Sequence, residues 1–305
     1  MPTNFTPSRD IPDLARKVIL ITGGTSGIGR AAVLSLAEHN PSHIYFTGRN
    51  AQAGAEVITE VRTLAPACPI TFIQCDLCSP RETIRAALSK HFNHSSRLDI
   101  FIANAGVMAI PHGLTPEGYE VQFGTNHMGH AVMMKQLRGV MARTADSNDV
   151  RFVALSSVGH NMHPPGGIQF ETIRTADALG KWANYGQSKL ANILYCKAMA
   201  KRYPKIMSVA VHPGLVRTGL SKSIRAESMV MSWMSWLMSS MYKSPEEGVY
   251  NTLWAATTPR GELTTGGYYE PVGKKTAGAK ACSDEALADK LWDWTEEELK
   301  DMEEL

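Results

Sequence analysis

A tyrosine and a lysine stand four residues apart in the segment NYGQSKLAN, at Tyr185 and Lys189. On a helix this spacing places both side chains on one face, one turn apart. A phenol ordinarily titrates at about pH 10, so it exchanges protons at neutral pH only where a neighbour stabilises its anion. A lysine ammonium can do this, and the pair could therefore carry proton transfer. The same spacing also arises on helices without any catalytic role.

A glycine-rich turn stands between a predicted strand at 17–22 and a predicted helix at 27–39, in the sequence TGGTSGIGRAA. Glycines allow a tight turn, and main-chain N–H groups at a helix start can bind a pyrophosphate. The spacing differs from G-x-G-x-x-G and from the P-loop, so a turn that serves packing alone is the alternative. The residues expected at this phosphate site are Gly23, Thr25, Ser26, Gly27, Ile28 and Gly29.

The second predicted strand ends in YFTGRN, which places Arg49 where many NAD-binding folds carry an acidic residue. A carboxylate there holds the ribose 2′-hydroxyl of NAD, whereas an arginine accommodates the 2′-phosphate of NADP. A guanidinium binds a phosphate through two hydrogen bonds, and a carboxylate would repel it. The sequence therefore favours NADP(H) as the cofactor. The alternative is a solvated surface arginine.

Short apolar runs alternate with longer segments of helical pattern as far as residue 215. The expected strands are 17–22, 43–47, 70–74, 98–103, 150–156 and 206–211, and the expected helices are 27–39, 50–64, 79–92, 115–143 and 182–203. Nearly continuous apolar strands indicate a sheet covered on both faces. We therefore expect an α/β fold with a doubly wound parallel sheet (Rossmann fold) in three α/β/α layers.

One domain over 1–305 is expected, since no linker, repeat or low-complexity segment divides the chain. Within it we expect an N-terminal tail at 1–14, a substrate-lid region at 215–245 and a C-terminal helical tail at 283–305. Residues 228–242 combine five methionines with two tryptophans. This segment could be a core helix, an adaptable apolar cover over a ligand, or a helix lying in a membrane surface.

Composition narrows the location and the partners. The net charge is +2 and no long basic run occurs, so nothing favours nucleic acid as a partner. Five cysteines, an odd number without a secretory signal ahead of them, indicate a reduced, cytoplasmic setting. Cys75 and Cys78 form an isolated C-x-x-C that we interpret as incidental. No window of about twenty apolar residues predicts a transmembrane helix.

Six further motifs follow in order along the chain. They are CDL (75–77), ANAG (103–106), TNHMGH (125–130), LSSVGH (155–160), YGQSK (185–189) and HPGLVRTGL (212–220). Together they resemble the short-chain dehydrogenase/reductase family over about residues 15–220. The segment GGYYEPVG (266–273) is similar to the closing strand of that fold. The subgroup looks most like retinol-dehydrogenase-like members and fungal secondary-metabolism members.

The resemblance implies an oxidoreductase whose catalytic residues are Asn126, Ser157, Tyr185 and Lys189. Tyr185 would exchange a proton with the substrate oxygen, and Lys189 would lower the pKa of the phenol and bind the nicotinamide ribose. Ser157, rather than its neighbour Ser156, would hydrogen-bond the substrate oxygen. Asn126 would hold a water beside Lys189 in a proton relay, or else cap an irregularity of its helix.

The resemblance also implies further contacts to NADP(H). Asp76 and Leu77 would lie at the adenine side, and the Asn104 segment at the adenine ribose. A loop after the sixth strand would contact the nicotinamide carboxamide. The full set of these implied contacts is Asp76, Leu77, Asn104, Ala105, Gly106, Pro213, Gly214, Val216 and Thr218, together with Tyr185 and Lys189.

The remaining histidines are ambiguous. His127 and His130 have a spacing compatible with metal binding, but the resemblance implies no metal. His160 and His163 follow the catalytic serine and could touch substrate or pack within the loop. The long proline- and glycine-containing segment between Ser157 and Tyr185 would form part of the substrate pocket.

The leading hypothesis is an NADP(H)-dependent oxidoreductase for a lipophilic carbonyl or secondary alcohol, such as a polyketide or terpenoid intermediate. A non-redox isomerase or dehydratase, and a non-catalytic NADPH-binding sensor, are the alternatives. Members of the family often pair through the two long helices, here 115–143 and 182–203. A homodimer is therefore a further expectation.

Overall fold

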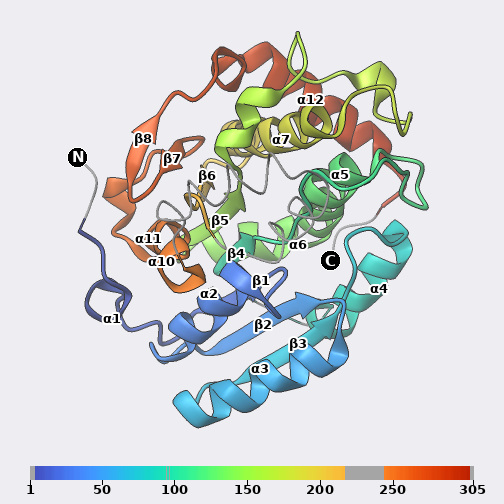
Figure 1. The fold of residues 1–305 in the computed structure, drawn as a ribbon. Coiled ribbons are helices and arrows are strands. Elements are labelled where there is room, and N and C mark those ends of the chain that lie inside the picture. The colour runs from blue at the N-terminus through green and yellow to red at the C-terminus, as the bar shows by residue number, and fades with distance from the viewer. Residues whose placement is uncertain (1–3, 94, 96, 217–243, 303–305) are drawn as a thin grey trace.

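The computed structural model describes residues 4–93, 95, 97–216 and 244–302. The 228–242 segment and most of the region expected to form a lid lie outside these residues. In the described part, one eight-stranded sheet has the order β3-β2-β1-β4-β5-β6-β7-β8, and its first seven strands are parallel (Figure 1). The reversal of strand order at β1 defines a doubly wound sheet, so the predicted α/β Rossmann fold is confirmed.

The six predicted strands form close to their expected positions, and two more follow them. The bounds are β1 Val18–Ile21, β2 His43–Gly48, β3 Ile70–Gln74, β4 Ile100–Ala103, β5 Val150–Leu155, β6 Ile206–Val211, β7 Tyr268–Glu270 and β8 Lys274–Thr276. Every residue of β4, β5 and β6 is buried, because helices cover both faces of the sheet. β7 extends the parallel sheet, as GGYYEPVG predicted, but β8 turns back antiparallel to it.

Helices lie in two layers on the two faces of the sheet (Figure 1). One core contains residues of α2 and α3 with those of α11, and the other contains residues of α4, α6, α7 and α12. Their bounds are α1 Pro7–Asp10, α2 Gly27–Ala37, α3 Ala51–Leu64, α4 Arg81–Phe92, α5 Val121–Phe123, α6 Gly129–Ala145, α7 Lys181–Arg202, α10 Pro245–Gly248, α11 Tyr250–Thr257 and α12 Glu285–Glu298. This gives the three α/β/α layers expected from the sequence.

The predicted helix at 115–143 differs from the observed structure. Regular helix begins only at Val121, and a π-helical turn at Gly124–Met128 separates α5 from α6. Single π-helical turns inside α-helices are frequent at functional sites. The turn contains Asn126, one of the expected site residues. The sequence suggested an irregularity at Asn126 only as an alternative, because the contacts of Asn126 are with residues distant in sequence.

The C-terminal helix α12 packs across α7 (Figure 1) and contacts α6 through side chains. Trp292 stacks on Tyr195 of α7 with ring centroids 5.2 Å apart. Glu296 accepts hydrogen bonds from Arg138 and Lys135 of α6, at 2.7 Å for each of the closest contacts. α12 therefore covers part of the surface of the two helices through which a homodimer was expected.

The N-terminal residues expected to form a tail are packed in the described part of the chain. Phe5, Ile11 and Leu14 are buried, and Phe5 contacts Tyr250 edge-on at 6.4 Å between ring centroids.

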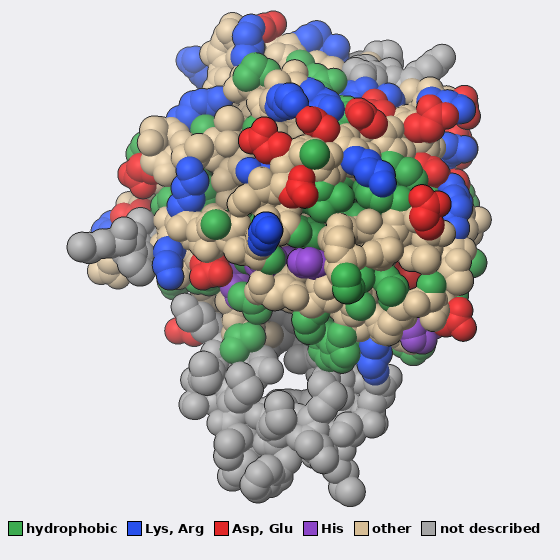
Figure 2. All heavy atoms as spheres, turned by 90° about the horizontal axis from the view of Figure 1, so that it is seen from above, with side chains coloured by type: hydrophobic (Ala, Val, Ile, Leu, Met, Phe, Trp, Pro, Cys, Tyr) green, Lys and Arg blue, Asp and Glu red, His purple; other side chains and the backbone are tan. Residues whose placement is uncertain are grey.

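On the face shown in Figure 2, basic and acidic side chains are interspersed. None of the described helices is both long enough and apolar enough to span a bilayer.

Candidate active site

The glycine turn after β1 has the geometry that its sequence predicted. Gly23 and Gly27 have positive φ values of 66° and 54°, which side chains with a Cβ rarely adopt. A Cβ on Gly29 would lie 2.2 Å from the Gly23 carbonyl oxygen. Gly48, at the end of β2, packs against Thr25 of the same turn so closely that a Cβ there would lie 2.5 Å from the threonine methyl. The backbone of this turn therefore requires glycine, because a Cβ at these positions would be strained or would clash with neighbouring atoms.

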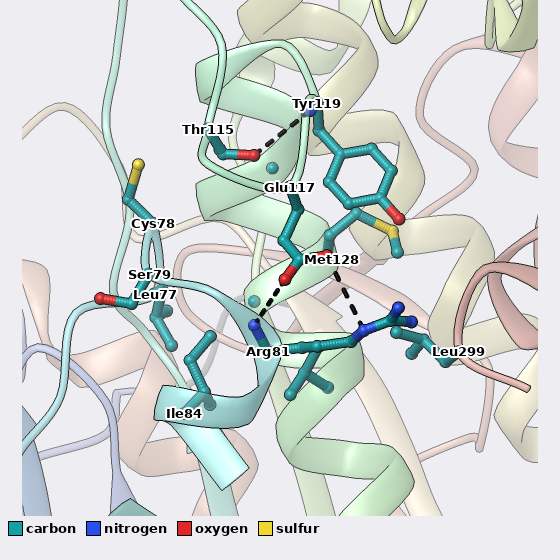
Figure 3. Close-up of a pocket in the computed structure, with 13 residues that line it drawn as sticks. Leu77, Cys78, Ser79, Arg81, Ile84, Thr115, Glu117, Tyr119, Met128 and Leu299 are labelled. Atoms are coloured by element: carbon teal, nitrogen blue, oxygen red, sulfur yellow. Dashed lines mark hydrogen bonds and ion pairs between the residues drawn. The ribbon is translucent and has the colours of Figure 1, made fainter. Parts of the chain in front are cut away.

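The N-terminus of α2 differs from those of the two helices that follow it. At α3, Asn50 accepts hydrogen bonds from two N–H groups of the first turn. At α4, the Glu117 carboxylate accepts one from the Arg81 N–H at 3.0 Å (Figure 3). Ser26 makes no such side-chain bond at α2. The positive end of α2, near Ile28, is thus available to an anion, and a dinucleotide pyrophosphate fits it.

The small cavity shown in Figure 3 lies between the turn after β3 and the end of α12. Leu77, Met128 and Leu299 are among its lining residues, and its volume is about 20 Å³. That is room for about one water molecule. It is a gap in packing and does not serve as a substrate site.

Arg49 follows the end of β2, and Asp76 lies in the turn after β3. The Arg49 side chain is exposed, and its carbonyl accepts a hydrogen bond from Gln74 at 3.1 Å. Asp76 closes its own turn by accepting from the Cys78 N–H at 3.0 Å. Burial raises the pKa of the Cys78 thiol, and the Arg49 charge opposes that rise. The guanidinium thus lies near the turn where the adenosine end of the nucleotide was expected.

The ANAG loop after β4 is tied to the end of β1 through Thr22. The Thr22 hydroxyl accepts hydrogen bonds from the N–H groups of Asn104 and Ala105, both at 2.9 Å. The Asn104 amide donates to the Thr22 carbonyl at 2.7 Å. Asn104 therefore fixes the loop that the nucleotide would contact. From the sequence, Asn104 was expected only as a contact to the nucleotide, and this structural role was not predicted.

Asn126 connects the loop after β4 to α7. Its amide nitrogen donates to the Val107 carbonyl and to the Ser188 hydroxyl, both at 2.9 Å, and its amide oxygen accepts from the Val107 N–H at 2.7 Å. Ser188 in turn donates to the Tyr185 carbonyl at 2.8 Å. Asn126 is fully buried and its side chain is fixed by these partners. Sequence reasoning missed Ser188, although it lies inside the YGQSK motif.

Gly106 packs against the side chains of Asn126 and Lys189, so a larger residue at this position should destabilise the fold. In Gly106→Ala, the new Cβ would lie 2.9 Å from the Asn126 amide oxygen and 3.3 Å from the Lys189 ammonium. Asn126 cannot yield without breaking its bonds, so we expect a loss of about 1–3 kcal/mol in the free energy of unfolding. Urea denaturation measures this. Gly113→Ala is the control, because no atom lies within 4 Å of its Cβ; equal stability of the two variants would contradict the account.

Ser157 and Tyr185 meet at the end of β5. The Ser157 hydroxyl accepts from the Gly159 N–H at 3.0 Å and also hydrogen-bonds the Tyr185 phenol. Gly159 packs against the phenol ring, where a Cβ would lie 2.5 Å from the Tyr185 Cε1. Ser156 is occupied elsewhere, since its buried hydroxyl donates to the Lys189 carbonyl at 2.8 Å. The structure thus places Ser157, and not Ser156, beside the tyrosine.

Lys189 lies one turn after Tyr185 on α7, as the spacing predicted. Its ammonium lies 5.8 Å from the centroid of the phenol ring and donates to the Leu155 carbonyl at 3.1 Å. Burial lowers the pKa of Lys189 to about 8. An ammonium with this pKa remains mainly protonated at pH 7, so the site retains a buried positive charge.

The pKa of Tyr185 departs from the expectation. Burial raises the pKa of the phenol above its usual value, and the Ser157 hydrogen bond opposes the rise. A depression caused by Lys189 is therefore not found in this structure, because desolvation of the phenolate dominates. The phenol is held in its protonated form, which is the form that donates a proton.

The loop after β6 reaches the same edge of the sheet. Gly214 has a positive φ of 92°, and Pro213 and Val216 are half-buried beside it. Thr218, expected at the nicotinamide, lies outside the described residues. Asn251 of α11 anchors the loop by donating to the His212 carbonyl at 2.7 Å. The sequence did not single out Asn251; its one signal is an amide within the mostly apolar segment VYNTLW.

The residues considered for metal binding do not form such a site in the described part of the chain, where no cluster of three or more His, Cys, Asp or Glu side chains could hold an ion. His127 and His130 instead hydrogen-bond the hydroxyls of Thr295 and Thr22, at 3.2 and 2.8 Å. Cys75 and Cys78 are free thiols. Burial raises the pKa of Cys75 to about 12, which disfavours the thiolate.

Comparisons with known proteins agree with this geometry. A family model described as short chain dehydrogenase matches residues 17–229. The chain is 35% identical to the short-chain dehydrogenase/reductase drtF of Aspergillus calidoustus over 96% of both proteins. It is 31% identical to retinol dehydrogenase 14 of Homo sapiens, covering 92% of this chain and 85% of that protein. A solved structure from Mycobacterium Paratuberculosis superposes with a TM-score of 0.73, 26% identity and 98% coverage of each chain.

The chain therefore belongs to the short-chain dehydrogenase/reductase family. It is an oxidoreductase of that family, which binds a nicotinamide dinucleotide. The resemblance first suggested by six short motifs is thus confirmed over most of the chain.

Proposed function

We propose that the protein is an NADP(H)-dependent oxidoreductase that transfers a hydride between the nicotinamide and a lipophilic carbonyl or secondary alcohol. One observation carries this proposal. The Tyr185 phenol, the Ser157 hydroxyl and the buried Lys189 ammonium lie together at the carboxyl edge of the sheet, on the side of the uncapped α2 N-terminus. Ligands of open α/β sheets bind at this edge.

The bound cofactor would be held by the glycine turn, Arg49, the Asp76 turn and the 104–106 loop, and it supplies the hydride. Tyr185 donates its proton to the substrate carbonyl oxygen, and its raised pKa keeps that proton available at neutral pH. Ser157 hydrogen-bonds the same oxygen and orients it. The Lys189 charge then stabilises the phenolate that remains after the transfer.

Arg49 supports NADP(H) in place of NAD(H). It is exposed at the end of β2, and the YFTGRN segment places no carboxylate there to repel a 2′-phosphate. We expect Arg49→Asp to weaken NADPH binding by about 100-fold, from a lost bidentate contact and a new repulsion, while NADH binding changes little. Fluorescence titration measures both. Arg62→Asp, an exposed arginine on α3, is the control; equal losses for NADPH and NADH would contradict the assignment.

A lipophilic substrate is supported by apolar side chains beside the catalytic serine. Val158 and Met162, which lie within five residues of Ser157, are large apolar side chains that are 40% and 39% exposed. Trp182 contacts the Tyr185 ring edge-on, with centroids 6.5 Å apart. Relatives named retinol dehydrogenase 14 and retinol dehydrogenase 11 are consistent with a lipophilic carbonyl or alcohol. A polyketide or terpenoid substrate and a cytosolic location stay predictions from the sequence.

Consumption of NADPH tests the proposal against its alternatives. The protein is incubated with NADPH and a panel of lipophilic ketones and aldehydes, and product and NADP⁺ are quantified together. We expect equal amounts of alcohol and NADP⁺. Product that forms without NADPH oxidation would indicate isomerisation or dehydration. Tight NADPH binding without any product would indicate a sensor.

A further inference from the structure

Two buried histidines lie beside the site without entering the proposed chemistry. His130 is 4% exposed and His160 is 1% exposed. Both ring nitrogens of each imidazole are hydrogen-bonded, which is what buried polar groups require. In each case one of the two partners is the main-chain carbonyl of a site residue.

The hydrogen bonds of His160 determine which nitrogen carries its proton. The Ala279 N–H donates to Nε2 at 3.1 Å, so Nε2 must be free of hydrogen. In the neutral ring the proton therefore resides on Nδ1, which lies 2.6 Å from the Ser157 carbonyl oxygen. His160 thus donates to Ser157 and accepts from the segment that leads into α12.

His130 has the same arrangement. Its Nδ1 lies 3.0 Å from the Asn126 carbonyl oxygen, which can only accept, so Nδ1 carries the proton. Nε2 then accepts from the Thr22 hydroxyl at 2.8 Å. This direction agrees with the other bonds of Thr22, because its oxygen already accepts the N–H groups of Asn104 and Ala105.

Burial keeps both rings neutral. It lowers the pKa of His130 to about 4 and also lowers the pKa of His160. A second proton would sit on Nε2 and point at a donor, the Ala279 N–H at His160, and both acceptor bonds would be lost. At neutral pH each ring therefore connects two distant segments of the chain in a fixed direction.

We propose that His130 and His160 are positioning residues, which hold the main-chain carbonyls of Asn126 and Ser157 through their Nδ1–H groups. His130 connects the π-helical turn to Thr22 at the end of β1, which in turn binds the loop after β4. His160 connects Ser157 to the C-terminal segment at Ala279. The inference rests on the proposed function for the roles of Asn126 and Ser157. Of the two roles considered for His160, this inference favours packing within the loop over contact with substrate, because both nitrogens of the ring already have hydrogen-bond partners.

His127 provides a matched control on the same helical segment. It is 1% exposed, its Nε2 hydrogen-bonds Thr295 at 3.2 Å, and its ring packs edge-on against Tyr195. It contacts α12 and makes no hydrogen bond to Asn126, Ser157, Tyr185 or Lys189. Substitutions at His127 therefore report what loss of a buried imidazole does to the fold.

The test replaces each of the three histidines by asparagine and, separately, by glutamine in the full chain. The kcat and KM of every variant are measured at a temperature below the melting temperature of the least stable variant. Asparagine places an amide nitrogen near the position of Nδ1, and glutamine places its amide near Nε2. We expect His130→Asn and His160→Asn to keep kcat within about 5-fold, and the glutamine variants to lose about 50-fold with little change in KM. His127→Asn and His127→Gln should have equal kcat. Glutamine variants as active as their asparagine partners would overturn the inference.

A spectroscopic readout separates this inference from the proposed function. ¹⁵N-detected imidazole spectra of the whole protein should show both rings protonated at Nδ1, with and without NADPH. An Nε2–H form of either ring would overturn the inference, whatever the activity. Absence of hydride transfer in the wild type would instead overturn the proposed function, and the spectra would still decide the direction of these hydrogen bonds.

Discussion

Tyr185→Phe should bind NADPH normally and lose turnover by about 1,000-fold or more, since a positioned general acid typically contributes 10²–10⁴. The substitution removes one oxygen and keeps the ring, which packs against Gly159 and Trp182. The hydrogen bond from the Ser188 hydroxyl to the Tyr185 carbonyl is also kept. The fold should therefore be intact, and stopped-flow and steady-state kinetics with NADPH should locate the defect in the chemical step.

Tyr195→Phe is the matched control on the same helix. Tyr195 is buried against Trp292, and its hydroxyl has no hydrogen-bond partner among the described residues. Its removal should leave kcat unchanged, because no buried partner loses a bond. If Tyr185→Phe turned over within about 10-fold of the wild type, the proton would come from another group and the mechanism would be wrong.

Lys189→Met should abolish most turnover and yet stabilise the free protein at neutral pH. Burial lowers the Lys189 pKa from 10.5 to about 8, so folding disfavours its charged form. A shift of this size corresponds to about 3 kcal/mol, present in full below pH ~8 and relieved as pH rises towards 10.5. Methionine removes this cost, and the Leu155 carbonyl still accepts from Asn192 at 3.0 Å.

Urea denaturation at several pH values tests the sign of this effect. Lys189→Met should be more stable than the wild type at pH 7, and the difference should shrink between pH 8 and pH 10. Lys197→Met, at a half-buried lysine two turns along the same helix, controls for the loss of a lysine from α7. A Lys189→Met protein less stable than wild type at pH 7 would show that the ammonium stabilises the fold.

The sheet could be predicted from the sequence because its strands are buried on both faces. Runs such as VRFVAL and IMSVAV are mostly apolar without strict alternation, and they form β5 and β6 with every residue buried. The glycine turn was equally readable, since the positive φ of Gly23 and Gly27 requires glycine at those positions. These features are determined locally, by the residues that form them.

Features that depend on partners elsewhere in the chain were not predictable. β8 reads KKT and is exposed at its two lysines, and it forms a strand because it pairs with Tyr268–Glu270. The π-helical turn depends on contacts of Asn126 with Val107 and Ser188, which are distant in sequence. The C-terminal helix was expected, but its packing over α6 and α7 was not.

The candidate site shows the same division. Motif order indicated Tyr185, Lys189, Ser157 and Asn126, and the structure brings all four to one edge of the sheet. Burial raises the pKa of the Tyr185 phenol, which is opposite in direction to the lowering expected from Lys189. The hydrogen-bond directions of His130 and His160 required the positions of Thr22 and Ala279, which no spacing reveals.

Transfer of deuterium from the cofactor tests the central claim most directly. NADPH carrying deuterium at C4 of the nicotinamide, prepared separately on each face, is incubated with the protein and a lipophilic ketone, and the alcohol is examined by mass spectrometry. The account predicts one deuterium on the carbinol carbon from one of the two cofactors, and none when Tyr185 is phenylalanine. An alcohol without deuterium from either cofactor would contradict it.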